Sequence, residues 1–187
     1  MRPKMKKMKR TIVNARLWAT GWAILRYLPR AFRLKPVNGL DFYAPETIAK
    51  FIQRVKSVRP DSIRQWGTMS PAQMLHHLNL AIGAPLGYYE LQDESYFLSR
   101  TLFKWITVDW FPEEPVGLQL PLSFVIPHDQ QFNFEYEQGQ LVKIITAAGQ
   151  AQPDDFGPHP YYGKMSYKEW GKLFIIHIDY HMRQFSA

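Results

Sequence analysis

Hydrophobic residues recur along much of this chain every three or four positions, the spacing that gathers side chains on one face of an α-helix. Ile48, Phe51 and Val55 follow this spacing and predict a helix over residues 46–58, which Pro60 closes. The sequence carries no internal repeat and no glycine-rich phosphate-binding loop. The pattern therefore favours a helical protein.

A second helix has clear start and stop signals. Ser70 is a good N-cap, Pro71 fits the first turn, and Gln73 stands at the third position of a capping box. Gly83 and Pro85 are residues that end helices. We therefore expect a helix that begins after Ser70 and ends near Gly83.

The middle of the chain is less regular. A third helix is predicted over about residues 94–106, and a long loop rich in Pro and Gly follows over residues 107–127. Asp129 can cap a fourth helix, whose second half, residues 141–149, has clear helical spacing. Its first half alternates almost like a strand and contains Gly139.

The last helix is predicted over residues 167–185, behind a second capping box formed by Ser166 and Glu169. Four or five helices joined by short connections and one long loop describe an all-α bundle. We place this bundle domain at residues 36–187 and treat residues 1–35 as a basic N-terminal extension.

Composition and charge narrow the functional classes. With 187 residues, 46% of them hydrophobic and 15% aromatic, the chain can bury a sizeable core. The absence of Cys excludes disulfides and thiolate metal ligands. Residues 1–35 hold eleven of the 23 Lys and Arg residues and no acidic residue, which leaves 12 basic against 16 acidic side chains in the body. No nucleic-acid partner is expected, because the body lacks a surplus of basic residues.

The extension has the character of a surface helix. Its longest uncharged stretch, residues 17–25, is short of the roughly 20 residues that a spanning helix needs. On a helix, Trp18, Trp22 and Leu25 share one side, flanked by basic residues, which predicts an interfacial helix on an anionic membrane. We therefore expect a cytoplasmic protein peripheral to the membrane. The alternatives are a helix packed on the body, a processed targeting segment and a true anchor.

Two imidazoles stand on the apolar face of the last predicted helix. The stretch IIHIDYHMRQF places His177 and His181 four positions apart, on the side that also carries Trp170 and Phe174. A buried polar group without a partner costs about 1–3 kcal/mol, so these rings require hydrogen bonds, water or a metal. Residues four apart have Cβ atoms about 5–6 Å apart, which lets both rings bind one cation.

A third imidazole comes from the helix behind Ser70. There His77 lies in the middle of the apolar arc, whereas His76 lies towards its edge. If the two helices are neighbours, His77, His177 and His181 form a three-His site with an open position, which suits a divalent ion such as Zn, Ni or Fe. The alternative is a water-filled polar pocket lined by hydrogen-bonded histidines.

Three ordered stretches, WGTMSPAQMLHHL, HPYYGKMSYKEW and HIDYHMRQF, resemble the DinB-like superfamily of metalloenzymes, which includes YfiT-type proteins. The closer resemblance is to its domain of unknown function 1569 branch, over about residues 40–186. It implies a four-helix bundle that holds a divalent metal on His77, His177 and His181. It excludes Tyr180 as a ligand, although many relatives carry a further His before the final one. Characterised relatives include thiol-dependent transferases and isomerases, and others are assigned as hydrolases.

Few other residues are candidates for the site. Gln73, His159 and Gln184 could orient a ligand or contact a substrate, although His159 fits better as a residue that orders its own loop. Asp179 faces the wrong side of its helix to contact the same metal.

Three hypotheses follow for function. The chain is a metal-dependent hydrolase or transferase, a non-catalytic bundle whose metal or ligand is structural, or a membrane-surface adaptor without chemistry. The expected partners are a small-molecule substrate, an anionic membrane surface contacted by residues 1–35, and a second copy of the chain in a homodimer.

Overall fold

The computed structural model describes residues 21–22, 24–29, 40–114 and 121–187. This part of the chain is all-α and contains no β-strand, only an isolated bridge between His159 and Gly163. Its long helices are α2 (Pro45–Ser57), α3 (Pro71–Gly83), α4 (Phe134–Gln150) and α5 (Tyr167–Gln184). Shorter helical turns are η2 (Ala84–Leu86), η3 (Ser99–Phe103), η4 (Trp105–Trp110), η5 (Leu122–Phe124) and η6 (Pro153–Asp155).

The two predicted capping boxes are confirmed, and they fix where α3 and α5 begin. The Ser70 hydroxyl accepts a hydrogen bond from the Gln73 amide, and the Gln73 side chain accepts one from the Ser70 amide. Ser166 and Glu169 make the same reciprocal pair at the start of α5. Each box satisfies amide groups that the first turn of a helix leaves unpaired.

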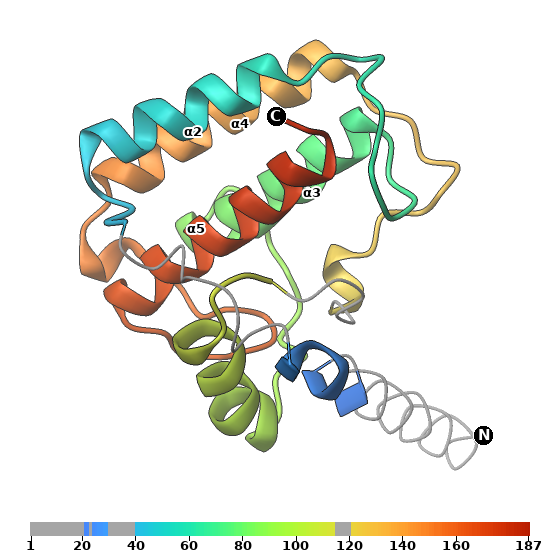
Figure 1. Ribbon diagram of the computed structural model, residues 1–187. Coiled ribbons are helices and arrows are strands. Elements are labelled where there is room, and N and C mark those ends of the chain that lie inside the picture. Colours follow the sequence, from blue (N-terminus) through green and yellow to red (C-terminus); the bar gives the residue numbers. More distant parts are fainter. Residues whose placement is uncertain (1–20, 23, 30–39, 115–120) are drawn as a thin grey trace, which may run out of the picture.

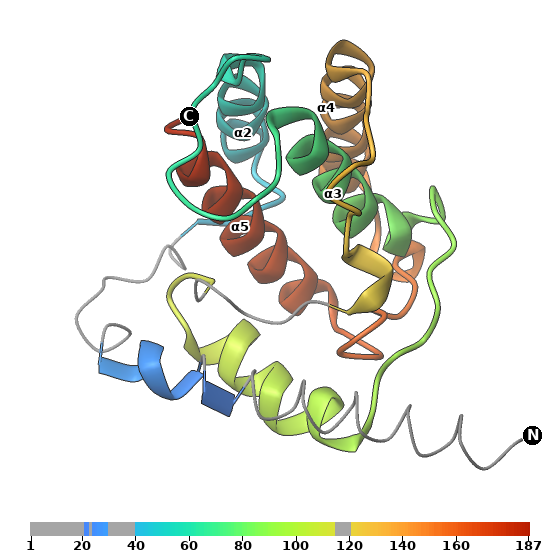
Figure 2. The same ribbon diagram turned by 90° about the vertical axis from the view of Figure 1, so that its right-hand side faces the viewer.

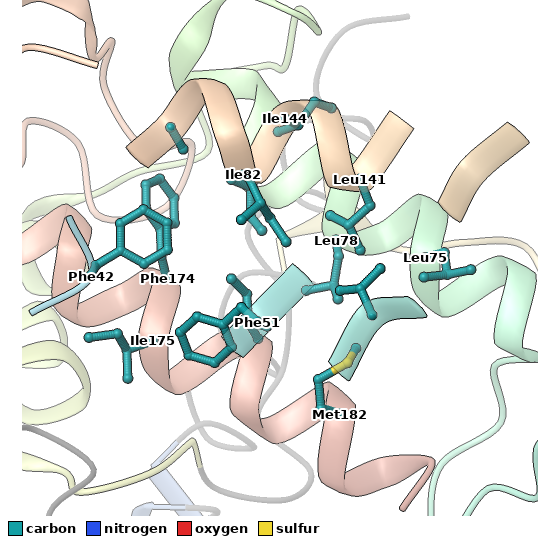
Figure 3. Close-up of a cluster of buried hydrophobic side chains, with 14 of the residues drawn as sticks. Phe42, Phe51, Leu75, Leu78, Ile82, Leu141, Ile144, Phe174, Ile175 and Met182 are labelled. Carbon is teal, nitrogen blue, oxygen red and sulfur yellow. The ribbon is translucent and has the colours of Figure 1, made fainter. Parts of the chain in front are cut away.

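The four long helices enclose the main core. Helix α4 lies alongside α2 and packs against α3, and α5 runs between α2 and α3 (Figures 1 and 2). Their facing sides bury a continuous apolar cluster that Figure 3 shows in part, including Phe42, Phe51, Leu75, Leu78, Ile82, Leu141, Ile144, Phe174, Ile175 and Met182. This core holds α3 beside α5, the two helices on which the predicted histidines stand.

Helix α4 begins later than predicted, at Phe134, and its N-cap is Asn133 rather than Asp129. The Asn133 side chain accepts a hydrogen bond from the Tyr136 amide at 2.8 Å. The preceding segment cannot continue the helix, because the Gln73 amide nitrogen binds the carbonyl oxygens of Pro127, His128 and Gln130. A contact across the fold therefore overrides the local capping signal.

The third predicted helix exists but is displaced and of a different type. It covers residues 97–110, and both η3 and η4 are π-helical, with hydrogen bonds between residues five apart. Glu94, the predicted first residue, instead accepts hydrogen bonds from the Leu122 and Ser123 amides. The loop that follows begins at Phe111 and not at Thr107.

A small second core joins the N-terminal extension to this π-helical segment. Residues 21–22 and 24–29 are helical, and Ile24 and Tyr27 are buried against Phe111. The rest of the extension lies outside the described residues, so the basic N-terminal helix as a whole stays a prediction. Within the described residues no helix is both long and apolar enough to cross a membrane.

Two glycines of α4 test how tightly α2 and α4 pack. A Cβ at Gly149 would lie 2.7 Å from the Cδ1 and Cγ1 atoms of Ile48 in α2, whereas a Cβ at Gly139 would meet nothing within 4 Å. We expect Gly149→Ala to lower the free energy of unfolding by about 1–3 kcal/mol through overpacking. Gly139→Ala should raise it by about 0.5–1 kcal/mol through helix propensity. Urea denaturation followed by circular dichroism measures both, and equal effects would show that the two helices are not in close contact.

Candidate metal centre

The three predicted histidines meet between α3 and α5. His77 comes from α3, and His177 and His181 come from successive turns of α5. Their ring centroids are 5.1 Å apart for His77 and His177, 4.9 Å for His77 and His181, and 4.8 Å for His177 and His181. The rings therefore form a nearly equilateral triangle, which the spacing within α5 and the packing of α3 against it produce together.

The ring nitrogens approach one another closely enough to share an ion. One nitrogen from each ring lies within 4.8 Å of the other two, and the Nε2 atoms of His77 and His177 are 3.0 Å apart. Nitrogens bound to one zinc ion at about 2.0–2.1 Å lie roughly 3.4 Å from one another in a tetrahedral site. The separation of 3.0 Å is close to that value and no pair is farther apart than 4.8 Å, so this group could hold a metal ion.

His77 is oriented by a backbone carbonyl. Its Nδ1 lies 3.1 Å from the carbonyl oxygen of Phe124, at the end of η5. A carbonyl oxygen only accepts hydrogen bonds, so Nδ1 carries the proton and the Nε2 lone pair remains free. The ring is 1% exposed, and Gln73 one turn earlier binds the segment that follows η5.

His177 is oriented by a carboxylate. Its Nδ1 lies 2.5 Å from an oxygen of Glu114, which is 8% exposed. Burial by itself would raise the pKa of Glu114, but the charge and the hydrogen bond of His177 hold the pKa of this carboxyl below its usual value. Glu114 is therefore ionised, and a carboxylate on Nδ1 again directs Nε2 into the triangle.

His181 is oriented by an amide whose direction is itself fixed. Gln184 donates from Nε2 to the carbonyl oxygen of Trp66 at 2.8 Å, so its Oε1 must be the atom 2.9 Å from Nδ1 of His181. Nδ1 of His181 is consequently the donor. The Gln65 amide also binds the Gln184 carbonyl, which ties the loop before α3 to the end of α5.

All three rings thus have their Nδ1 atoms beside an acceptor, which leaves the Nε2 lone pairs of His77 and His181 free, while Nε2 of His177 faces Nε2 of His77. Burial lowers the pKa of His77 to about 3, helped by the neighbouring His177. Burial also lowers the pKa of His181 well below its ordinary value. These two imidazoles are neutral at pH 7, which is the protonation state that a metal ligand requires.

An ion-pair chain holds the Glu114 segment against α5. Arg183 pairs with Glu113 at 3.0 Å and with Asp179 at 2.8 Å. Asp179 also binds Arg54 of α2 at 2.8 Å. Asp179 therefore faces away from the three histidines, as its helical position predicts, and serves to link α2, α5 and the residue before Glu114.

The remaining histidines take other roles. His76 lies at the rim, where it contacts Glu137 at 3.1 Å and stacks on Phe132, so only His77 of this pair joins the cluster. Tyr180 packs on Trp66 and on the His181 ring. The sequence separates the inward His from its neighbour correctly.

His159 orders its own loop. Its Nδ1 accepts hydrogen bonds from the amides of Tyr161 and Tyr162 at 3.0 and 3.1 Å. Burial, helped by the charge of His177, lowers the pKa of His159 to about 3, so the ring is neutral with its proton on Nε2. It also lines a cavity of about 360 Å³ between residues 84–93 and 157–160.

Two site residues escape sequence reasoning. Glu114 stands in the irregular segment before residue 115, where no periodicity indicates an inward direction, and Phe124 contributes only a backbone carbonyl. Of the residues predicted around the site, Gln184 contacts a cluster histidine, whereas Gln73 contacts the backbone of residues 127–130.

Comparison with known proteins places most of the chain in one family. Residues 39–187 match the model of the family described as "Protein of unknown function (DUF1569)". No curated protein and no solved structure shows significant similarity to the chain.

Replacing His159 should reveal its effect on the loop. His159→Leu leaves the amides of Tyr161 and Tyr162 without an acceptor, at about 1–3 kcal/mol for each buried donor. His159→Asn supplies an acceptor oxygen near the position of Nδ1 and should retain much of that stability. Chemical denaturation compares the two variants, and an identical loss in both would argue against the hydrogen-bonding role.

Proposed function

The chain belongs to the family of proteins of unknown function DUF1569, and we propose that it is a divalent-metal-dependent enzyme of the hydrolase or thiol-dependent transferase type. The metal would be held by His77, His177 and His181, with water or substrate at the remaining position. The observation that carries the proposal is the convergence of one ring nitrogen from each of three histidines whose Nδ1 atoms each lie beside an acceptor.

A metal ion bound by all three histidines accounts for their arrangement better than a proton shared between His77 and His177 does. The Nε2 atoms of His77 and His177 at 3.0 Å would repel each other if both lone pairs were bare, so positive charge is needed between them. One proton on His177 would satisfy that pair. It would not account for His181, whose ring centroid lies 4.8 Å from that of His177 and 4.9 Å from that of His77. A cation is attracted to all three nitrogens.

The proposed architecture is a DinB-like four-helix bundle formed by α2, α3, α4 and α5. Ligands on two facing helices of a bundle, directed inward, are a common way to build a metal site in all-α proteins. The packing of α5 against both α2 and α3 supports this assignment.

A metal on three neutral imidazoles would supply a Lewis acid and lower the pKa of a bound water to about 7. Glu114, Phe124 and Gln184 would keep the three rings in the ligand orientation, because each accepts the Nδ1 proton. Fixing a ligand through its second nitrogen raises its basicity and its affinity for the ion.

The cavity beside His159 is the proposed place for a small-molecule substrate. Its volume of about 360 Å³ falls in the range typical of ligand pockets. The His159 ring, which forms part of its lining, packs on Phe124, the residue that orients His77. Glu90 and Asp93 also line this cavity, so a polar or cationic group suits its outer part.

A second candidate is a non-catalytic bundle in which the metal only stabilises the fold. The observation in its favour is burial, because His77 is 1% exposed, His181 is 3% exposed and the His177 side chain is 11% exposed. A site that is closed to substrate would have this character.

Metal binding is the first test. Protein purified without a His-tag, stripped with a chelator and titrated with Zn²⁺ should bind one ion per chain. Cobalt(II) should give the visible absorption of a tetrahedral site. His77→Ala, His177→Ala and His181→Ala should each abolish stoichiometric binding, because two imidazoles remain in every case.

His76→Ala is the matched control, since it removes the adjacent imidazole on the same helix from outside the cluster. It should bind the ion as the unaltered chain does. Glu114→Leu should weaken zinc binding by about 10–100-fold through loss of the orienting carboxylate. No stoichiometric zinc, nickel or iron binding by the unaltered protein would overturn the metal proposal.

Catalysis is tested separately on metal-loaded protein. A set of ester and thiol-acceptor substrates should be turned over by the unaltered chain and not by His177→Ala, because that variant lacks the assembled site. If the unaltered chain binds metal but turns over substrate no faster than His177→Ala, the metal is non-catalytic and the enzyme proposal fails.

A further inference from the structure

An exposed apolar surface covers one side of the π-helical segment. Phe97 is 77% exposed, Leu102 46% and Trp105 55%. The opposite side of the same segment is buried through Ser99, Thr107 and Val108. Apolar side chains on a solvent-facing helix side normally mark a place where something else binds.

The N-terminal helical residues that pack on this segment also expose apolar side chains. Trp22 and Leu25 are 61% and 59% exposed, while Ile24 and Tyr27 on the other side of that helix are buried. The buried pair packs on Phe111, with Phe103 and Ile106 of the π-helical segment beside it. The small core therefore holds the N-terminal helical residues against the π-helical segment, and each of these two elements also has large apolar side chains exposed to solvent. In Figure 1 both elements lie at the end of the molecule away from α2 and α4.

The π-helical geometry explains why aromatic residues gather there. Hydrogen bonding between residues five apart brings positions i and i+5 onto one side. Trp105 and Trp110 accordingly stack with centroids 6.0 Å apart and ring planes 7° from parallel. Rigid aromatic rings at a surface are the residues that the boundary between lipid headgroups and acyl chains favours.

Charge identifies the partner. The chain segment that carries Trp22 and Leu25 is part of residues 1–35, which hold eleven basic and no acidic residues, and Arg26, directly after Leu25, is exposed. The rest of the chain has 12 basic and 16 acidic residues, so the surplus of positive charge belongs to the same stretch of sequence as Trp22 and Leu25. Basic residues beside exposed Trp and Leu match an anionic bilayer, where each Lys or Arg near the surface contributes to binding.

We propose that residues 22, 24–29 and 97–110 together form a surface that docks on anionic lipid bilayers. Trp22, Leu25, Phe97, Leu102 and Trp105 would enter the interfacial region, and exposed Arg26 would face the lipid phosphates. The extension alone is already expected to bind membranes; the new element is the π-helical segment, which provides three of the five apolar side chains. This inference is independent of the metal centre.

Vesicle sedimentation tests the proposal on the full chain. The protein should bind phosphatidylcholine vesicles that contain phosphatidylserine and bind pure phosphatidylcholine weakly. Added salt should reduce binding because it screens the charges. A variant combining Phe97→Ser, Leu102→Ser and Trp105→Ser keeps every charge and should lose affinity by about tenfold or more, since the interfacial apolar contact is removed.

The matched control replaces equally exposed apolar residues elsewhere. Ile63 and Tyr136, 80% and 60% exposed, lie outside both elements, and Ile63→Ser with Tyr136→Ser should leave binding unchanged. Far-ultraviolet circular dichroism and an unaltered denaturation midpoint confirm that both variants are folded.

Three outcomes would overturn the proposal. The first is equal vesicle binding by the triple variant and the unaltered chain, which would leave the extension as the sole contact. The second is binding that does not depend on phosphatidylserine. The third is a lipid-free dimer in analytical ultracentrifugation that the triple variant converts to monomer, which would make a second copy of the chain the occupant of this surface.

Discussion

Burying three imidazoles between α3 and α5 with an acceptor beside each Nδ1 is the constraint on which this structure depends. Each ring needs an acceptor for its Nδ1 proton, and each acceptor comes from a different part of the chain: the Phe124 carbonyl of η5, the Glu114 carboxylate and the Gln184 amide. Gln184 is itself held by the Trp66 carbonyl. The irregular segments that contain Glu114 and Phe124 are therefore held in place by their hydrogen bonds to the histidines.

The helical frame of this site is readable from the sequence, because local physics determines it. The capping boxes at Ser70 and Ser166 and the 3.6-residue periodicity place α3 and α5, and periodicity alone separates the inward His77 from His76. These signals depend only on neighbours within one or two turns.

What the sequence does not reveal depends on contacts between distant segments. The start of α4 moves from Asp129 to Asn133 because Gln73, more than 50 positions earlier, binds the carbonyls of residues 127–130. Glu114 reaches His177 through a loop with no repeating pattern, and the Phe124 carbonyl would be the same for any side chain. The π-helical hydrogen bonding of residues 97–110 likewise leaves no period that differs clearly from that of an α-helix.

The π-helical segment also fixes how many residues can lie between its exposed aromatic side chains and the three-His cluster. Only three residues separate Trp110, at the end of η4, from Glu114. Removing one residue from a helix turns everything beyond the deletion by about 100° and shifts it by about 1.5 Å along the axis at α-helical geometry. The carboxylate would then leave His177. In the course of evolution this stretch should accept changes of residue type far more readily than changes of length.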